Sequence, residues 1–386
     1  MKPSISGPAQ RNLLFISFSQ LGAAFSFSFV NIFLPFYIYR ISPYSIQETL
    51  LWIGLILGST GLVTAFTSPF WGSLTHHYSP KMLYLRGFIV HSILIFAMGL
   101  TTNLHLLLIL RIAQGLVGGI STIGFIIISS SSLKERLSFD MGVYQSSMTL
   151  GQLVGPPLGS LAAGTLGFKG AFFAASIMLF TSFLFCYLYV TDVPQLPKEK
   201  KAVTRTPIEK RVLVGWMVCF MAQVQLMFLP SILPNVLKQF GLEQTVALKL
   251  AGTVVMLYTA TALIGTYVWS WLSRRAGVPR MVMILFALGI LFQSLLVFCR
   301  GLVDFTAIRM IQTGFIAATI PLVMSIFASE PRGGVIGFLN SARFAGMALG
   351  PFIATSVLAF SSLPVLFLMI SGLSLFVLFG FRLFFK

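Results

Sequence analysis

Three arginines lie inside long apolar stretches of this sequence: Arg111, Arg309 and Arg343. A guanidinium keeps its charge at any accessible pH, and its planar N–H groups can hold a carboxylate through two parallel hydrogen bonds. Because a charge at the centre of a membrane helix costs on the order of 2.5–3.5 kcal/mol, each arginine needs compensation. One hypothesis is a cationic cavity that binds an anionic or carboxylate-bearing solute. The alternative is that these side chains extend to the lipid headgroups.

Acidic residues are missing from the middle of the same stretches. All nine Asp and Glu fall in expected loops or at helix ends, where Asp140 and Asp304 are interpreted as helix-capping residues. His91 lies midway along an expected membrane helix. It is a candidate for proton coupling, although a lone histidine on an apolar helix is more often a hydrogen-bonded structural residue.

Amide side chains recur in the apolar stretches and could line a polar cavity. Interhelical hydrogen bonding is the alternative for each of them. The candidates are Gln20, Asn31, Gln114, Gln145, Gln223 and Asn340.

The composition indicates the elements that must position these residues. Hydrophobic residues make up 56% of the chain and charged residues 9%, against roughly 25% charged in soluble domains. The mean hydropathy is +0.92. Long continuous apolar runs predict membrane-spanning helices and exclude the alternating pattern of a barrel. We therefore predict an all-α membrane protein with twelve transmembrane helices, at 12–39, 50–73, 82–101, 104–131, 139–165, 170–190, 212–237, 246–273, 279–299, 303–329, 333–359 and 364–385.

The sequence repeats its own motifs, which predicts two six-helix bundles related by a pseudo-twofold axis. The matching residues are Trp71 and Trp269, Arg111 and Arg309, Gln114 and Gln312, and Pro35 and Pro234. Residues 1–190 form the N-terminal bundle, 191–211 a basic cytoplasmic linker, and 212–386 the C-terminal bundle. Two parallel halves of this kind are typical of secondary transporters, which hold a small-molecule substrate between the halves.

The net charge of +17 reflects membrane orientation rather than nucleic-acid binding. Most Lys and Arg fall in loops on one side when both termini are placed in the cytoplasm, which is the positive-inside pattern, and they favour contact with anionic membrane lipid. No soluble segment could form a basic nucleic-acid-binding face. The three cysteines have no metal-site or disulfide spacing, and we expect no metal and no cofactor.

Glycines four residues apart mark one expected helix of each half. Gly151, Gly155 and Gly159 share a face, with Pro156 between them. Glycine at this spacing lets a neighbouring helix approach closely, and proline removes a backbone donor and bends the helix. The second half repeats the pattern at Gly346, Gly350 and Pro351.

These motifs resemble those of the major facilitator superfamily, and in particular its twelve-helix drug:proton antiporter branch. Residues 151–159 resemble the fifth-helix antiporter motif, and 111–119 resemble the fourth-helix motif with its buried arginine. The loop at Gly72–Lys81 resembles a third motif. The resemblance implies alternating access, with drugs or metabolites exported in exchange for protons.

The loop motif departs from the family pattern at one position. Where the family has an aspartate that latches the cytoplasmic side, this chain has His76. The histidine could make the latch weaker or pH-dependent, or it could simply add to the basic loop.

Three functions compete at this point: a multidrug exporter, a dedicated exporter of an anionic metabolite such as a carboxylate siderophore, and a non-transporting membrane receptor. The sequence has no catalytic motif of a membrane enzyme. We expect a monomer in the bacterial inner membrane.

Overall fold

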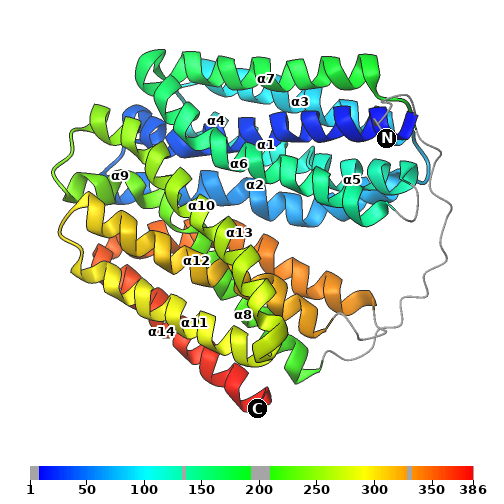
Figure 1. The fold of residues 1–386 in the computed structure, drawn as a ribbon. Helices are drawn as coiled ribbons and strands as arrows, with labels where there is room; N and C mark the ends of the chain where they lie inside the picture. Colours follow the sequence, from blue (N-terminus) through cyan, green and yellow to red (C-terminus); the bar gives the residue numbers. More distant parts are fainter. Residues whose placement is uncertain (1–7, 133–135, 193–208, 328–332, 386) are drawn as a thin grey trace. The chain divides into compact units, whose positions relative to one another are not determined.

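The protein is all-α, as predicted. The computed structural model describes residues 8–132, 136–192, 209–327 and 333–385 (Figure 1). Within these ranges the chain forms helices and no β-strand. The α-helices are α1 (Pro8–Ile41), α2 (Ile46–Leu74), α3 (Pro80–Leu100), α4 (Leu104–Leu116), α5 (Ile120–Ser131), α6 (Leu137–Thr165), α7 (Gly167–Tyr189), α8 (Lys210–Met227), α9 (Leu229–Gln239), α10 (Gln244–Ala276), α11 (Val278–Leu295), α12 (Leu302–Ile326), α13 (Gly333–Phe360) and α14 (Leu363–Phe384).

Ten helical segments of the described chain are long and apolar enough to cross a membrane, with α4 and α5 together counted as one of them. The bent pair of α8 and α9 would make an eleventh. The glycine-, serine- and proline-containing α6 forms at the predicted place but does not meet this test. The protein is therefore a multi-pass membrane protein, while the count of twelve spans and the pseudo-twofold relation stay predictions.

Two of the predicted helices are interrupted: 104–131 forms as α4 and α5, which still count as one candidate span, and 212–237 forms as the bent pair of α8 and α9. The first break separates α4 from α5, where Gly119 adopts a left-handed φ of 97°, a conformation that glycine tolerates without steric strain. The second separates α8 from α9 with a bend of 43°. It directly precedes Pro230, which has no N–H to continue the helical hydrogen bonds.

The backbone contacts divide the chain into two compact units. The first unit comprises residues 1–37 and 63–203, and the second comprises 38–62 and 204–386. The division therefore cuts through α2, whereas the boundaries expected from the repeat followed the sequence order. Thr191 and Asp192 of the expected linker belong to the first unit, and residues 193–208 of that linker lie outside the described chain.

The predicted close packing of the glycine helices is confirmed in each unit. A Cβ added at Gly151 would lie 2.4 Å from the Leu21 carbonyl oxygen on α1, and one added at Gly159 would lie 2.3 Å from that of Phe29. In the second unit, a Cβ at Gly346 would lie 2.6 Å from the Cβ of Gln223 on α8. Gly155 and Gly350 belong to the same motifs. Gly155 lies beside Phe25 of α1, and Gly350 lies beside Val224 of α8. The helices α6 and α13 continue through Pro156 and Pro351.

The part of α2 that belongs to the second unit also makes a close helix contact there. A Cβ added at Gly58 would lie 2.5 Å from the carbonyl oxygen of Ala348 on α13, and one at Gly54 would meet the Thr355 hydroxyl at 2.0 Å. In the same unit, the Tyr39 hydroxyl donates to Asn235 Oδ1 at 3.0 Å.

Candidate functional site

Arg111 is held in the first unit by two of the predicted cavity residues. It lies on α4 with 5% of its side chain exposed. Its Nη1 donates to Gln114 Oε1 at 3.0 Å, and its Nη2 donates to Asn31 Oδ1 on α1 at 2.9 Å. The Nε2 of Gln114 is buried with no hydrogen-bond partner among the described residues. This cluster combines a buried cation with an amide donor that has no acceptor among the described residues.

Arg309 occupies the matching place in the second unit but is completely enclosed, with 0% exposure. Its Nη1 donates to Gln312 Oε1 at 2.6 Å, and its Nη2 donates to the backbone carbonyls of Gln225 at 2.7 Å and Leu226 at 3.3 Å. The guanidinium carbon lies 4.9 Å from the centre of the Phe228 ring. In this conformation Arg309 binds the break between α8 and α9 rather than an open cavity.

Arg111 and Arg309 bind different acceptors because the helix that each one contacts has a different residue at the matching position. Pro35 matches Pro234 in the repeat, and the same offset places Pro230 where the first half has Asn31. The proline removes the amide that would bond to the Leu226 carbonyl four residues earlier. Arg309 supplies that donor, whereas Arg111 bonds to the Asn31 side chain. The match between Asn31 and Pro230 was present in the sequence and was not used in the prediction.

The other predicted cavity residues lie in several separate places. Gln20 is buried in the first unit, donates to the Ser121 hydroxyl at 3.0 Å and accepts from Tyr144 at 2.9 Å. Gln145 is exposed on α6. Gln223 packs against Gly346. On α13, the exposed Arg343 lies with its Nη1 3.4 Å from Asn340 Oδ1.

His91 is buried on α3 and has a defined structural environment. Its Nδ1 lies 2.7 Å from the Gly87 carbonyl oxygen one helical turn away. The ring packs edge-on against Phe27 of α1, with the ring centres 5.2 Å apart. These contacts are those expected of a hydrogen-bonded structural histidine, and its predicted part in proton coupling is not tested by them.

The break between α4 and α5 is closed by two side chains: Trp71, which the sequence analysis noted only as part of the repeat, and Arg86, which it did not single out. Trp71 Nε1 donates to the Leu116 carbonyl at 2.7 Å. Arg86 Nη2 donates to the carbonyls of Val117 at 3.0 Å and Gly118 at 3.3 Å. The Arg86 guanidinium also lies 3.2 Å from the Trp71 ring centre, which is a cation–π contact. The unpaired carbonyls at this helix end are therefore bound by α2 and α3.

The loop motif at Gly72–Lys81 contacts an acidic residue that was expected in the linker. Asp192 accepts from the Ser79 hydroxyl and, at 3.2 Å, from the Lys81 backbone amide. Lys81 Nζ donates to the Tyr187 carbonyl at 3.0 Å. Asp192 thus joins the start of α3 to the end of α7. The role of His76 as a latch stays a prediction.

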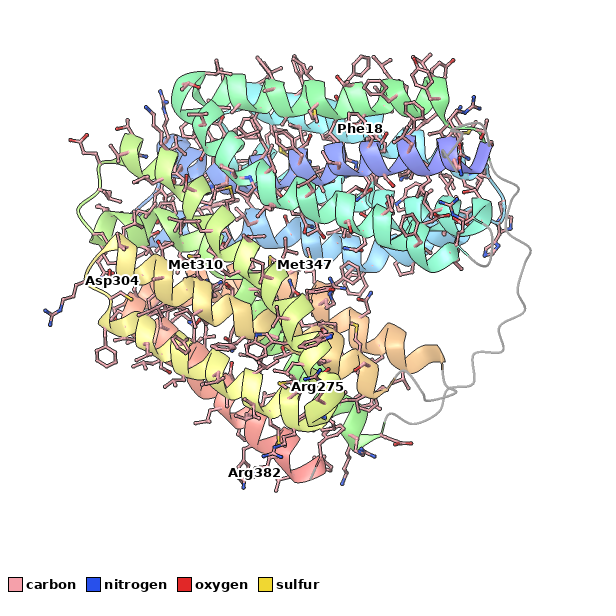
Figure 2. All side chains as sticks on the ribbon, in the orientation of Figure 1. Phe18, Arg275, Asp304, Met310, Met347 and Arg382 are labelled. Carbon is pink, nitrogen blue, oxygen red and sulfur yellow. The ribbon has the colours of Figure 1, made fainter. Side chains whose placement is uncertain are left out.

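Two acidic residues at helix starts behave differently. Asp304 caps α12, as expected, and accepts from the backbone amides of Arg300 at 2.6 Å and Gly301 at 2.8 Å (Figure 2). Asp140 in the first turn of α6 is only 6% exposed, and its Oδ1 has no hydrogen-bond partner among the described residues. The expectation that Asp140 merely caps its helix does not account for this buried oxygen.

Residues that bind metals form no cluster of three or more in the part of the chain that the structure describes. Cys186 and Cys219 are buried, and Cys299 is half-buried; all three are free thiols. Burial, together with the nearby Asp304 carboxylate, raises the pKa of the Cys299 thiol to about 11, so this cysteine stays protonated and unreactive near neutral pH.

Both the sequence and the fold of this chain are similar to those of known proteins. The family model described as Major Facilitator Superfamily matches residues 16–308 and 216–386. The chain belongs to this superfamily. This major facilitator protein is 24% identical over 348 residues to the multidrug resistance protein MdtG of Yersinia enterocolitica, which covers 88% of this chain and 84% of the relative. It is 26% identical over 349 residues to MdtG of a Rahnella strain, with 88% and 84% covered.

Solved structures of major facilitator transporters have the same fold. The nucleoside transporter NupG matches with a TM-score of 0.76 at 15% identity, covering 98% of this chain and 99% of that one. The human organic anion transporter TETRAN matches with a TM-score of 0.69 at 18% identity, covering 97% and 100%. At these identities the likeness establishes the fold and leaves the substrate open. The chain is a membrane transporter of the major facilitator type.

Proposed function

We propose that this transporter exports small organic molecules, with a multidrug range, across a bacterial inner membrane by alternating access. The observation that carries the proposal is the match over most of the chain to proteins named as multidrug resistance proteins. The glycine face of α6, which packs on the α1 backbone, supports it because the same residues resemble the antiporter motif. Each half would move as a body during the transport cycle.

A drug-susceptibility panel tests this proposal. The gene would be expressed in a bacterial strain that lacks its main efflux pumps, and minimum inhibitory concentrations would be measured for cationic, neutral and anionic compounds. We expect resistance to rise at least fourfold for several unrelated compounds. Unchanged susceptibility across the panel, with the protein present in the membrane, would contradict a multidrug range.

The second candidate is a dedicated exporter of an anionic metabolite, and the cluster around Arg111 favours it. Arg111, Gln114 and Asn31 present a buried cation and a buried N–H without an acceptor. A carboxylate would accept a hydrogen bond from this Gln114 N–H beside the guanidinium. Arg343 is an exposed second cation, on the second unit, whereas Arg309 binds the carbonyls of Gln225 and Leu226 at the break between α8 and α9. Accumulation of one carboxylate compound in cells that lack the protein, with normal drug susceptibility, would support this candidate over the first.

Proton coupling is the further part of the proposal. Asp140 supports it better than His91, because its buried Oδ1 lacks a partner among the described residues, whereas the Nδ1 of His91 lies 2.7 Å from the Gly87 carbonyl oxygen. In proteoliposomes with a pH gradient, Asp140→Asn should transport without responding to the gradient, and His91→Gln should keep the response. If both variants respond like the wild type, another group carries the proton.

The proposed orientation has both termini in the cytoplasm, because this places the basic segments inside. A fluorescent protein fused after Lys386 should fold and fluoresce, and alkaline phosphatase fused at the same place should be inactive. An inactive fluorescent protein together with an active phosphatase would show that the C-terminus lies outside the cytoplasm. We also propose that the transporter acts as a monomer.

A further inference from the structure

An apolar groove lies on the second unit between the start of α8 and the end of α14. It has a volume of about 240 Å³ and is lined from α8 by Val214 and Met217 and from α14 by residues that include Phe376, Gly380 and Leu383. Phe376 is 72% exposed and Leu383 is 57% exposed. The helix α14 is long and apolar enough to cross a membrane, and so is the bent pair of α8 and α9 taken together. We therefore expect the groove to meet hydrocarbon rather than water, and its apolar walls suit an acyl chain.

Three cationic side chains are placed at the same end of the unit. Lys210 and Arg211 begin α8, and Arg382 lies in the last turn of α14, where Figure 2 labels it. All three are exposed. The Arg211 guanidinium lies 4.8 Å from the centre of the Phe385 ring, so the two helix ends are in contact. Lys210 is one helical turn from Val214 and therefore shares its face.

The charge balance at this end of the unit is positive. Glu209, which is also exposed, precedes Lys210. Within the described helix ends that form the groove (209–217 and 376–385), Glu209 is one acidic residue against the three cations, so positive charge is in excess next to the apolar groove. Favourable interaction with the α14 dipole accounts for Arg382 alone, and membrane orientation accounts for basic residues anywhere on this side. Neither accounts for their position at the mouth of a groove.

We propose that this groove binds an anionic phospholipid. One acyl chain lies along α8 and α14 between Met217 and Phe376, and the phosphate lies against Arg382, Arg211 and Lys210. Basic residues between transmembrane helices at the membrane surface bind anionic headgroups, and each cation contributes about fivefold to the affinity at the surface. The proposal concerns the lipid-facing side of the second unit and does not depend on what the protein transports.

Two glycines of α14 make a matched test of the acyl-chain site. Gly380 lines the groove, and a Cβ added there would meet nothing within 4 Å, so Gly380→Leu should fill the groove without disturbing the fold. Gly372 is equally free of neighbours within 4 Å but is not among the lining residues. Native mass spectrometry of the purified protein, titrated with dioleoylphosphatidylglycerol, would count bound lipid. We expect Gly380→Leu to lose one tightly bound lipid and Gly372→Leu to keep it.

The headgroup part of the site is tested by removing charge. Arg382→Gln and Arg211→Gln should each weaken phosphatidylglycerol binding about fivefold and leave dioleoylphosphatidylcholine binding unchanged. Lys238→Gln, on α9 at the other end of the second unit, is the control and should bind like the wild type. Thermal unfolding of each variant in detergent would establish that it is folded. Equal binding of the two lipids by the wild type, or full binding by Gly380→Leu, would overturn the proposal.

Discussion

Arg309 donates from Nη2 to the backbone carbonyl of Leu226 at 3.3 Å, which is the carbonyl that Pro230 leaves without a helical donor. Arg86 does the equivalent in the first unit, where its Nη2 binds the carbonyls of Val117 and Gly118 after the end of α4. Each broken helix is therefore completed by an arginine from a neighbouring helix. In an apolar environment such a donor stabilises the fold strongly, because no water molecule can bond to the carbonyl in its place.

Replacing Arg309 should destabilise the protein, because the carbonyls at the break between α8 and α9 would lose their hydrogen-bond donor. Arg309→Gln would leave the carbonyls of Gln225 and Leu226 without their donor, and a buried unsatisfied group costs about 1–3 kcal/mol. A leucine at position 230 would restore an N–H for Leu226. We therefore expect Arg309→Gln to lower the unfolding temperature more in the wild type than in the Pro230→Leu background. Equal losses in both backgrounds would show that Arg309 does not act through this carbonyl.

Replacing Arg111 should instead impair transport while leaving the fold largely intact. Its guanidinium donates to the side-chain amide oxygens of Gln114 and Asn31, and a glutamine at position 111 can again donate to amides. We expect Arg111→Gln to lower the transport rate at least tenfold, with a smaller change in unfolding temperature than Arg309→Gln causes. Wild-type transport by Arg111→Gln would remove this residue from the candidate site.

The glycine face of α6 provides a matched pair for close packing. A Cβ at Gly159 would lie 2.3 Å from the Phe29 carbonyl oxygen, while one at Gly142 on the same helix would meet nothing within 4 Å. Overpacking costs about 1–3 kcal/mol, whereas alanine in place of an unconstrained helical glycine gains roughly 0.5–1 kcal/mol. Thermal unfolding should therefore show a loss for Gly159→Ala and no loss for Gly142→Ala. The idea fails if the two variants unfold at the same temperature.

The residues that close the break between α4 and α5 should act as a pair. Trp71→Phe removes the donor to the Leu116 carbonyl, and Arg86→Met removes the donors to Val117 and Gly118. Each substitution should cost about 1–3 kcal/mol. Because the two side chains are in contact, the loss in the double variant should differ from the sum of the single losses. Trp271→Phe, at an exposed tryptophan of the second unit, is the control and should be close to neutral. Strict additivity would show that the stacked geometry has no energetic role.

Apolar runs and glycine spacing predicted much of the fold, because both follow from local sequence. The helix expected at 364–385 is α14 (Leu363–Phe384), and the glycine faces at Gly151–Gly159 and Gly346–Gly350 make the expected close contacts. The breaks were missed because hydropathy does not distinguish a continuous span from a broken one. At the second break, Pro230 gave a usable signal. At the first, the carbonyls beside Gly119 are bound by Trp71 and Arg86, which are distant in sequence, so no local pattern indicated the break.

The candidate site was harder to predict than the fold. Repetition placed Arg111 and Arg309 at matching positions, but it could not show that one bonds to Asn31 and the other to the backbone. The role of Asp192 depends on the end of α7 lying beside the start of α3. These residues are distant in sequence, and no local pattern connects them.

The unbroken helix α2 has a mechanical consequence for any movement of the two units. The 29 residues of α2, at a rise of about 1.5 Å per residue, form one continuous helix. The two ends of this helix belong to different compact units. A rotation of one unit against the other must therefore bend α2 or break the contacts of one of its ends. The contact of Gly54 and Gly58 with α13 involves small groups and backbone, so it can part and close again with few side-chain rotamers to rearrange.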